Sequence, residues 1–414
     1  MSAASGSVAT DNGRNAYVDW LRAFSLLVVI LWHWAFTLIT WNPANGPHAN
    51  SPLGFTKGFW ILTWLLQVMP LFFYIGGFVH LRSWERAQAR GERLAHFVGT
   101  RLRQLAVPAA LLVLTWAALG AGLGRYFDLN GETIRRTVKL IVSPLWFLAV
   151  YLMLIALLPI ALWLHRRFGI LVVIWLGGLA MTTDVLRFHY HLDPLAWLNM
   201  VFVWALAHQA GFFYRQVVDA PRQVDWTLLW AGLFGLVGMV FSGLYPGSMV
   251  GVPGDRFSNV APPTFVIVCL LVFQVGVVEV LRPTMERLLV RPRWALVNST
   301  INRFALPLFL FHSTGMALSR FITWRLGLQS ADKPPPDLTW WLLRPVAVLG
   351  PLVCTLPVIF LFGRRWIRAA PPRAGPPPVA GPPVPRAAPG VEAAPAVEVA
   401  PETAVPDRPG LHSS

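Results

Sequence analysis

The sequence predicts an all-α protein that crosses a membrane many times, and three observations support this class. Of the 414 residues, 55% are hydrophobic and only 13% are charged, and the mean hydropathy is +0.55. Apolar runs long enough to cross a bilayer as a helix, about 20 residues each, recur along most of the chain. The 20 tryptophans are numerous, and tryptophan is enriched at the two bilayer interfaces.

The apolar runs predict a transmembrane helical bundle of about ten spans. They lie near residues 20–40, 59–80, 104–124, 145–164, 168–186, 194–213, 226–245, 263–281, 301–319 and 341–363. Lys and Arg concentrate in the loops after the second, fourth, sixth, eighth and last spans. This bias predicts a multi-pass protein of the cytoplasmic (inner) cell membrane, with both termini in the cytoplasm (N-in and C-in).

The ends of the chain differ in composition from the apolar part. Residues 1–16 are polar and lack the features of a signal peptide, so we expect disorder there and a retained first span. Residues 17–366 form the predicted membrane domain. Residues 367–414 are rich in Pro and Ala, with few residues that could form a core, which predicts a disordered cytoplasmic tail.

Composition also excludes some functions. The net charge of +15 comes from arginines scattered among short loops, which indicates topology and a lipid bilayer as partner, and no nucleic acid. Cys269 and Cys354 each lie within an apolar run, so we expect no disulfide framework and no thiolate metal site. His189 and His191 share an outer loop without a carboxylate cluster, and we predict no metal.

The first span carries an unusual polar stripe. Asp19 and Arg22 are three residues apart, so they share a helix face and can pair at the membrane boundary. His33 follows Arg22 by eleven positions and returns to nearly the same face, roughly 16 Å deeper. An intramembrane histidine either stabilises packing against another helix or belongs to a functional site. The stripe favours the functional interpretation.

Four further residues are candidates. Arg101 and Arg103 lie in the basic loop after the second span, where guanidinium groups could bind a polyanion as well as set topology. Trp146 opens the fourth span and, taken alone, is an interfacial aromatic residue. His312 is a second intramembrane histidine, preceded by Pro307, for which packing and function are both open interpretations.

These segments together resemble the integral-membrane acyltransferase-3 family. The resemblance rests on DWLRAFSLLVVILWH, PLFFYIGGFV, RLRQLAVP, PLWFLAVYL and LFLFH, in this order, and covers about residues 15–365. Its most specific element is an arginine followed, after ten residues, by a histidine: Arg22 and His33. The family's basic loop has two arginines separated by two residues; here Gln104 stands at the second position, and Arg103 lies one position earlier.

The resemblance implies an O-acyltransferase without a cofactor. An acyl group, acetyl or another short chain, would move from cytoplasmic acyl-CoA, the donor substrate, to a hydroxyl of a cell-envelope glycan, a glycolipid or a small acceptor. His33 and His312 would be catalytic, with His33 as general base. Some family members add a soluble extracytoplasmic domain; we expect none here, so the membrane domain or a separate extracytoplasmic partner protein would complete transfer.

The resemblance also implies how the donor is held. Arg22, Arg101 and Arg103 would bind the coenzyme A phosphates, and Asp19 and Trp146 would support the site. Two other classes stay open from the residues alone. A multi-span transporter or flippase could use intramembrane histidines as proton relays, although Asp and Glu lie mostly at span ends. A non-catalytic membrane sensor would signal through the Pro-rich tail.

Overall fold

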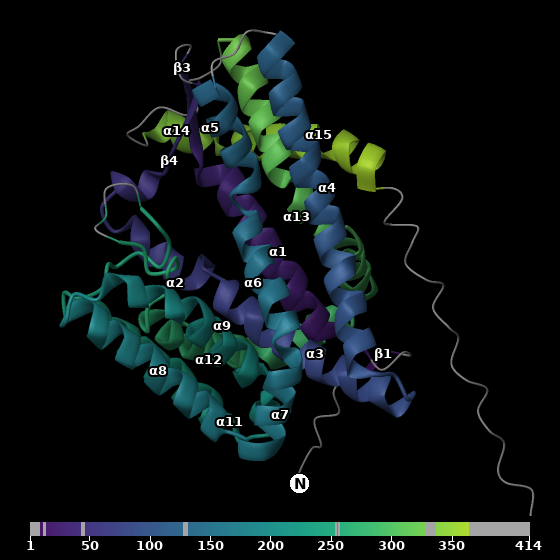
Figure 1. Cartoon of the computed structure of the whole chain (residues 1–414), viewed down its shortest axis with the longest axis vertical. Coiled ribbons are helices and arrows are strands. Elements are labelled where there is room, and N and C mark those ends of the chain that lie inside the picture. Colours follow the sequence, from purple (N-terminus) through teal and green to yellow (C-terminus); the bar gives the residue numbers. More distant parts are fainter. Residues whose placement is uncertain are drawn as a thin grey trace, which may run out of the picture. The chain divides into compact units, whose positions relative to one another are not determined.

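Figure 1 shows the computed structural model of the chain, in which helices pack side by side and strands are few. The structure describes residues 9–10, 14–42, 46–126, 131–252, 255, 257–327 and 337–363. The longer helices are α1 (Ala16–Phe36), α3 (Met69–Ala89), α4 (Leu94–Tyr126), α8 (Leu171–Phe188), α11 (Arg222–Phe241), α12 (Val266–Leu289), α13 (Pro292–Arg325) and α15 (Arg344–Val358). The prediction of an all-α fold is confirmed.

Shorter elements complete the described chain. The short helices are α2 (Leu62–Leu66), α5 (Gly131–Val142), α6 (Leu145–Ala156), α7 (Leu158–Phe168), α9 (Asn199–Gly211), α10 (Tyr214–Val218) and α14 (Leu338–Leu342). Short segments of 3-10 helix cover Pro52–Gly54, Phe59–Ile61 and Asp193–Leu198, and a π-helical turn covers Ile359–Gly363. Strand β1 (Ala9–Thr10) pairs antiparallel with β2 (Arg14–Asn15), and β3 (Leu38–Asn42) pairs with β4 (Gly46–Asn50).

The described ranges contain eight helices long and apolar enough to cross a membrane, or nine if α5 and α6, bent by 50°, form one span. Two segments account for the difference between these numbers and the roughly ten spans predicted from the sequence. Residues 145–164 divide into α6 and α7 at Pro159, and residues 194–213 form a 3-10 turn that contains Pro194 followed by the 13-residue α9. Proline interrupts a helix because it lacks an N–H and clashes with the preceding turn.

The outer faces of the spanning helices carry exposed apolar side chains. Leu114, Phe234 and Phe241 are 65%, 68% and 79% exposed, a pattern that water disfavours and lipid tails accommodate. The protein is therefore a multi-pass membrane protein. Helix α3 differs from these helices, because nearly all residues of its first three turns are buried among other helices.

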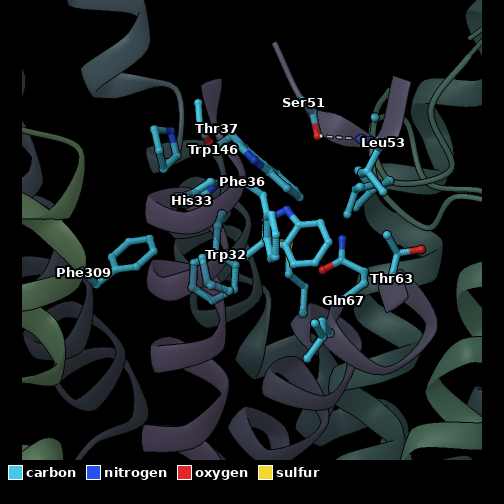
Figure 2. Close-up of a pocket in the computed structure, with 18 residues that line it drawn as sticks. Trp32, His33, Phe36, Thr37, Ser51, Leu53, Thr63, Gln67, Trp146 and Phe309 are labelled. Atoms are coloured by element: carbon cyan, nitrogen blue, oxygen red, sulfur yellow. Dashed lines mark hydrogen bonds between the residues drawn. The ribbon is translucent and has the colours of Figure 1, made fainter. Parts of the chain in front are cut away.

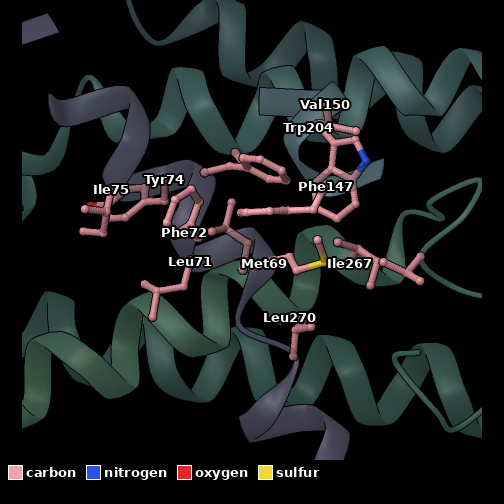
Figure 3. Packing of buried hydrophobic residues seen from close by; sticks show 14 of the residues in the cluster. Met69, Leu71, Phe72, Tyr74, Ile75, Phe147, Val150, Trp204, Ile267 and Leu270 are labelled. Atoms are coloured by element: carbon pink, nitrogen blue, oxygen red, sulfur yellow. The ribbon is translucent and has the colours of Figure 1, made fainter. Parts of the chain in front are cut away.

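Aromatic and aliphatic side chains from α3, α6, α9 and α12 fill the centre of the bundle (Figure 3). Phe73 of α3 contacts Phe147 of α6 and Trp204 of α9, with ring centroids 5.2 and 5.0 Å apart. Two glycines let α3 and α9 approach closely. A Cβ added at Gly77 would lie 1.9 Å from the carbonyl oxygen of His208, and one at Gly211 would lie 1.8 Å from that of Tyr74.

Helix α1 is held at both ends by side chains of other helices. Asn298 and Asn302 of α13 donate to the backbone carbonyls of Ala16 and Asp19, at 3.1 and 3.0 Å. At the other end, Arg320 of α13 donates to the Trp34 carbonyl at 3.1 Å. Arg344 of α15 donates to the Ala35 carbonyl at 2.9 Å. The carbonyls of a last helical turn lack intrahelical partners, and cations there also stabilise the helix dipole.

A loop between α11 and α12 lies against α2, near the C-terminal end of α1. The hydroxyl of Thr63 accepts from the backbone N–H of Met249 at 2.9 Å, and Gln67 Nε2 donates to the Met249 carbonyl at 3.3 Å. Trp64 Nε1 donates to the Gly247 carbonyl at 2.9 Å. These bonds fix the loop over the end of the bundle where α1 terminates, which we call the cavity side; the end where α1 begins is the basic side.

The predicted division into an N-terminal segment, a membrane domain and a tail is only partly covered by the described residues. Within the segment 1–16, Ala9–Thr10 and Arg14–Asn15 pair as strands, and the rest before Arg14 lies outside the described residues. The chain divides by contacts into Met1–Pro371 and Pro372–Ser414. The whole predicted tail, 367–414, lies outside the described residues.

The close approach of α3 and α9 predicts a stability effect at Gly77. Gly77→Ala forces a methyl group into the His208 carbonyl, and overpacking of this kind costs about 1–3 kcal/mol. The apparent melting temperature of the purified protein in detergent micelles is expected to fall. The matched control is Gly178→Ala on α8, where an added Cβ meets nothing within 4 Å. Equal melting temperatures for the two variants would contradict the packing described here.

Candidate active site

Two histidines from helices far apart in sequence meet inside the bundle. His33 of α1 and His312 of α13 lie with Nδ1 of the first 3.1 Å from Nε2 of the second. Their rings are nearly parallel, at an interplanar angle of 15°. Trp34 Nε1 donates to the backbone carbonyl of His312 at 3.0 Å, which fixes the two helices in this register. The structure therefore brings together the two intramembrane histidines singled out from the sequence.

A backbone carbonyl determines how protons are arranged in this pair. His312 Nδ1 lies 2.5 Å from the carbonyl oxygen of Phe309, which can only accept, so Nδ1 carries a proton. In a neutral imidazole the other nitrogen, Nε2, is then an acceptor. The single lone pair of Nε2 faces His33 Nδ1 at 3.1 Å and the Ser313 hydroxyl at 3.2 Å, so the contact with His33 is a hydrogen bond only if His33 Nδ1 carries a proton. His33 Nε2 is consequently left with its lone pair, which suits a proton acceptor.

A cavity of about 280 Å³ lies beside His33 (Figure 2). Aromatic side chains form much of its wall: Trp32, Phe36, Trp146, Phe147 and Phe309. Its polar groups include the side chains of Thr37, Ser51, Thr63 and Gln67, and Figure 2 shows the last two across the cavity from His33. Of the described residues that line it, His33 alone is titratable. His312 does not line the cavity and lies behind His33.

The same stripe on α1 ends in an ion pair on the basic side. Arg22 Nη1 lies 3.9 Å from Asp19 Oδ1, as the three-residue spacing predicts, and the Arg22 side chain is 39% exposed. A single uninterrupted helix joins this pair to His33. Arg22 of α1 lies within electrostatic range of Arg101 of α4 and of Tyr151 of α6.

Arg101 and Arg103 differ in environment although they are two residues apart. The Arg101 guanidinium lies over the Phe97 ring, 4.2 Å from its centroid, and its Nε is buried without a hydrogen-bond partner in the described part of the chain. Arg103 is exposed, as is Gln104. Residues two apart on a helix differ by about 200° in direction. Helix α4 therefore directs Arg101 toward the side on which Arg22 lies, and it directs Arg103 away from that side.

The remaining sequence candidates have defined positions. Trp146 lines the cavity, with its ring centroid 6.3 Å from that of Trp204. His189 is exposed at the end of α8, and His191 follows it in the loop. Across the described ranges, no group of three or more His, Cys, Asp and Glu side chains could hold a metal ion.

Sequence reasoning missed a second histidine pair. His80 Nδ1 of α3 lies 2.9 Å from His208 Nε2 of α9, and the Tyr151 hydroxyl of α6 lies 3.2 Å from His80 Nε2. Both histidines stand near the polar ends of apolar runs, where a histidine in a sequence is easily taken for a boundary residue. The available signal was Gly76–Gly77 three residues before His80, since small residues mark close helix contacts.

Most of the chain matches the model of a known protein family. Residues 15–363 match the family described as "Acyltransferase domain" (Acyl_transf_3). The matched range includes α1 with His33, α4 with Arg101, and α13 with His312. The chain belongs to this family of membrane acyltransferases. No protein of curated function and no solved structure matches it.

The cavity predicts a difference in thiol accessibility between two neighbouring positions. In a background with Cys269 and Cys354 replaced by Ala, a Thr37→Cys thiol faces the cavity, whereas a Ser313→Cys thiol is buried behind His33. A water-soluble maleimide is expected to label Thr37→Cys faster, by on the order of tenfold, because reaction requires access to the thiolate. Mass spectrometry of intact protein over time gives both rates. Comparable rates would show that the cavity is closed to water.

Proposed function

We propose that this protein is a membrane O-acyltransferase, which moves an acyl group from acyl-CoA to the hydroxyl of a cell-envelope glycan, a glycolipid or a small acceptor. The observation that carries the proposal is His33, whose Nε2 is left as an acceptor by the bond from its Nδ1 to His312 and which lines the cavity. Family membership supports acyl transfer as the class of reaction. The cell membrane is the proposed location, with the basic side in the cytoplasm.

The proposed reaction balances with protein side chains and the two substrates alone. His33 Nε2 takes the proton of the acceptor hydroxyl as its oxygen attacks the thioester carbonyl carbon. The carbon–oxygen bond forms, the carbon–sulfur bond breaks, and the coenzyme A thiolate leaves. The proton on His33 then passes to the thiolate, which restores neutral His33 and releases coenzyme A. His312 holds the His33 ring and accepts from its Nδ1–H while the positive charge exists.

The basic side has the features of a site for the coenzyme A phosphates. Guanidinium groups bind phosphate through paired, charge-assisted hydrogen bonds. The buried Nε of Arg101 has no partner in the described part of the chain, and a phosphate oxygen would supply one. Asp19 restrains Arg22 on the same side. Arg103, being exposed, would add to the local positive potential without a fixed contact.

The cavity suits an uncharged acceptor with an apolar face. Aromatic rings such as Trp32 and Trp146 stack on the C–H faces of sugars or on lipid chains, and the nearby hydroxyl and amide groups can bind hydroxyls. A carboxylate or phosphate acceptor would find no cation among the described residues that line the cavity. With the basic side in the cytoplasm, the acceptor enters from the opposite face of the membrane.

The test of this function is a histidine series. His33→Ala is expected to lower acyl transfer by about 10²–10⁴-fold, the usual contribution of general acid–base catalysis. His312→Ala is expected to lower kcat with a smaller effect on KM, because it removes the acceptor that orients His33. His312→Gln is expected to recover part of the loss, since a glutamine oxygen can accept from Nδ1–H. Membranes would be incubated with radiolabelled acetyl-CoA, and label in the glycan and lipid fractions measured.

The matched control for this series is His189→Ala, a histidine exposed at the end of α8. It is expected to transfer label at the wild-type rate. Full activity in His33→Ala protein would refute His33 as the base. Flux of an acceptor across vesicles without any transfer of label would instead favour a transporter.

The two arginines of α4 give a second prediction, for the donor. Arg101→Ala is expected to raise the KM for acyl-CoA by roughly ten- to hundredfold, since a hydrogen bond to a charged group contributes about 1.5–3 kcal/mol. Arg103→Ala is expected to change it by less than about threefold, because exposed charges contribute little. Initial rates at varied acyl-CoA give both values. Equal effects of the two substitutions would contradict the difference in their environments.

A further inference from the structure

The second histidine pair, with Tyr151, forms a polar chain inside an otherwise apolar part of the bundle. His80 and His208 are only 3% and 1% exposed, and each belongs to a different helix. Buried polar groups are costly unless they are hydrogen-bonded. His80 meets this need with both ring nitrogens, one to His208 and one to the Tyr151 hydroxyl. The two histidines thereby hold the phenol in a fixed place.

Tyr151 lies between the cavity and the two arginines. It follows Phe147 by four residues on α6, so it lies about 6 Å, or one helical turn, further toward the basic side. Phe147 lines the cavity with His33. On its other side, Tyr151 lies within the electrostatic reach of Arg22 and Arg101. As a whole residue, Tyr151 is half-buried, whereas His80 and His208 are buried.

Packing restricts the phenol ring to this position. The Tyr151 ring contacts Phe72 and Phe73 of α3, with centroids 5.4 and 6.3 Å away. Gly76 provides the space for it, because a Cβ there would come within 3.0 Å of Tyr151 Cε2. Tyr151 therefore packs against the same two rings, Phe72 and Phe73, as Phe147, which lines the cavity.

The hydrogen bonds of this chain can run in either direction. Tyr151 can donate to His80, which then donates to His208, and the phenol oxygen remains an acceptor. In the reverse order His208 donates to His80, His80 donates to the phenol oxygen, and the Tyr151 O–H is available as a donor. Among the described residues, no hydrogen bond to a backbone group fixes either order. Tyr151 can thus bind either the N–H or the C=O of an amide.

We propose that Tyr151 binds the amide of the pantetheine arm that lies nearest the sulfur, and that His80 and His208 position it to do so. This proposal rests on the proposed function and identifies a donor subsite within it. Two methylenes separate the thioester sulfur from that amide nitrogen, so an amide held at Tyr151 would keep the thioester close to Phe147, one helical turn away. Binding at Tyr151 would set the depth of the thioester so that its carbonyl reaches the hydroxyl held at His33. Fixing reacting groups in this way lowers the barrier through orientation.

Donors of decreasing length test the proposal. Radiolabelled acetyl-CoA, S-acetylpantetheine and S-acetyl-N-acetylcysteamine all retain the amide nearest the sulfur, whereas S-ethyl thioacetate has none. Tyr151→Phe keeps the ring and removes the hydroxyl. It is expected to lower kcat/KM by roughly tenfold with the three amide-bearing donors, the upper end for one hydrogen bond, and to leave S-ethyl thioacetate within about twofold.

The matched control is Tyr214→Phe. Tyr214 is a buried tyrosine that also packs against α3, and its hydroxyl has no hydrogen-bond partner in the described part of the chain. It is expected to behave as wild type with all four donors. His80→Leu removes the group that holds the phenol. Like Tyr151→Phe, it is expected to lower kcat/KM with the three amide-bearing donors and not with S-ethyl thioacetate. His80→Gln, which can still bind the phenol, is expected to retain the preference for amide-bearing donors.

Two outcomes overturn the proposal while the proposed function stands. One is an equal loss with all four donors, which would indicate a role in packing or in the chemical step. The other is no loss with any donor in Tyr151→Phe protein. If wild-type membranes transfer label from none of the donors, the proposed function itself fails, and the subsite with it. The donor pattern separates these cases because a folding defect lowers all four rates together.

Discussion

The contact between α1 and α13 is the constraint on which the rest of the structure depends. Within a bilayer, polar groups have no water to bind and must find partners in the protein. Along this contact Asn298 and Asn302 bind backbone carbonyls near the start of α1, and Arg320 binds one near its end. The His33–His312 bond lies between these fixed points. The register of the two long helices is therefore set by these polar contacts, and it brings the two histidines of the site together.

This register determines what the two sides of the bundle can do. On the cavity side, His33 meets aromatic walls and uncharged polar groups. On the basic side, Arg22 and Arg101 supply positive charge, and Tyr151 with its histidines lies between the two regions. A donor carrying phosphates and an uncharged hydroxyl acceptor require environments of this opposite kind. The arrangement supports the proposed reaction, in which the two substrates approach from opposite faces and meet at His33.

Much of this could be predicted from the sequence, because it depends on local periodicity. The polar stripe of Asp19, Arg22 and His33 follows from helical spacing alone, and α1 is the uninterrupted helix that this spacing requires. The different environments of Arg101 and Arg103 were also open to prediction, since two residues span about 200° of a helix. The division of residues 145–164 and 194–213 was signalled by Pro159 and Pro194.

Pairings between distant helices could not be predicted in this way. His33 and His312 are 279 residues apart, and His80 and His208 are 128 apart. No local pattern states which helices become neighbours; that depends on contacts such as Gly77 against the His208 backbone. A single histidine in an apolar run is therefore ambiguous between packing and chemistry until its partner is known. In this protein the two histidine pairs bind different groups, a backbone carbonyl and a phenol, and these groups allow different proton arrangements.

The first pair ends on a backbone carbonyl and the second ends on a phenol. The Phe309 carbonyl can never donate, so the proton order through His312 to His33 has one direction, and His33 Nε2 is an acceptor before any substrate arrives. Tyr151 both donates and accepts, so the order through His80 and His208 can reverse with the ligand. A general base needs the fixed arrangement, because its lone pair must be available in every cycle. A subsite that binds an amide group benefits from the reversible one.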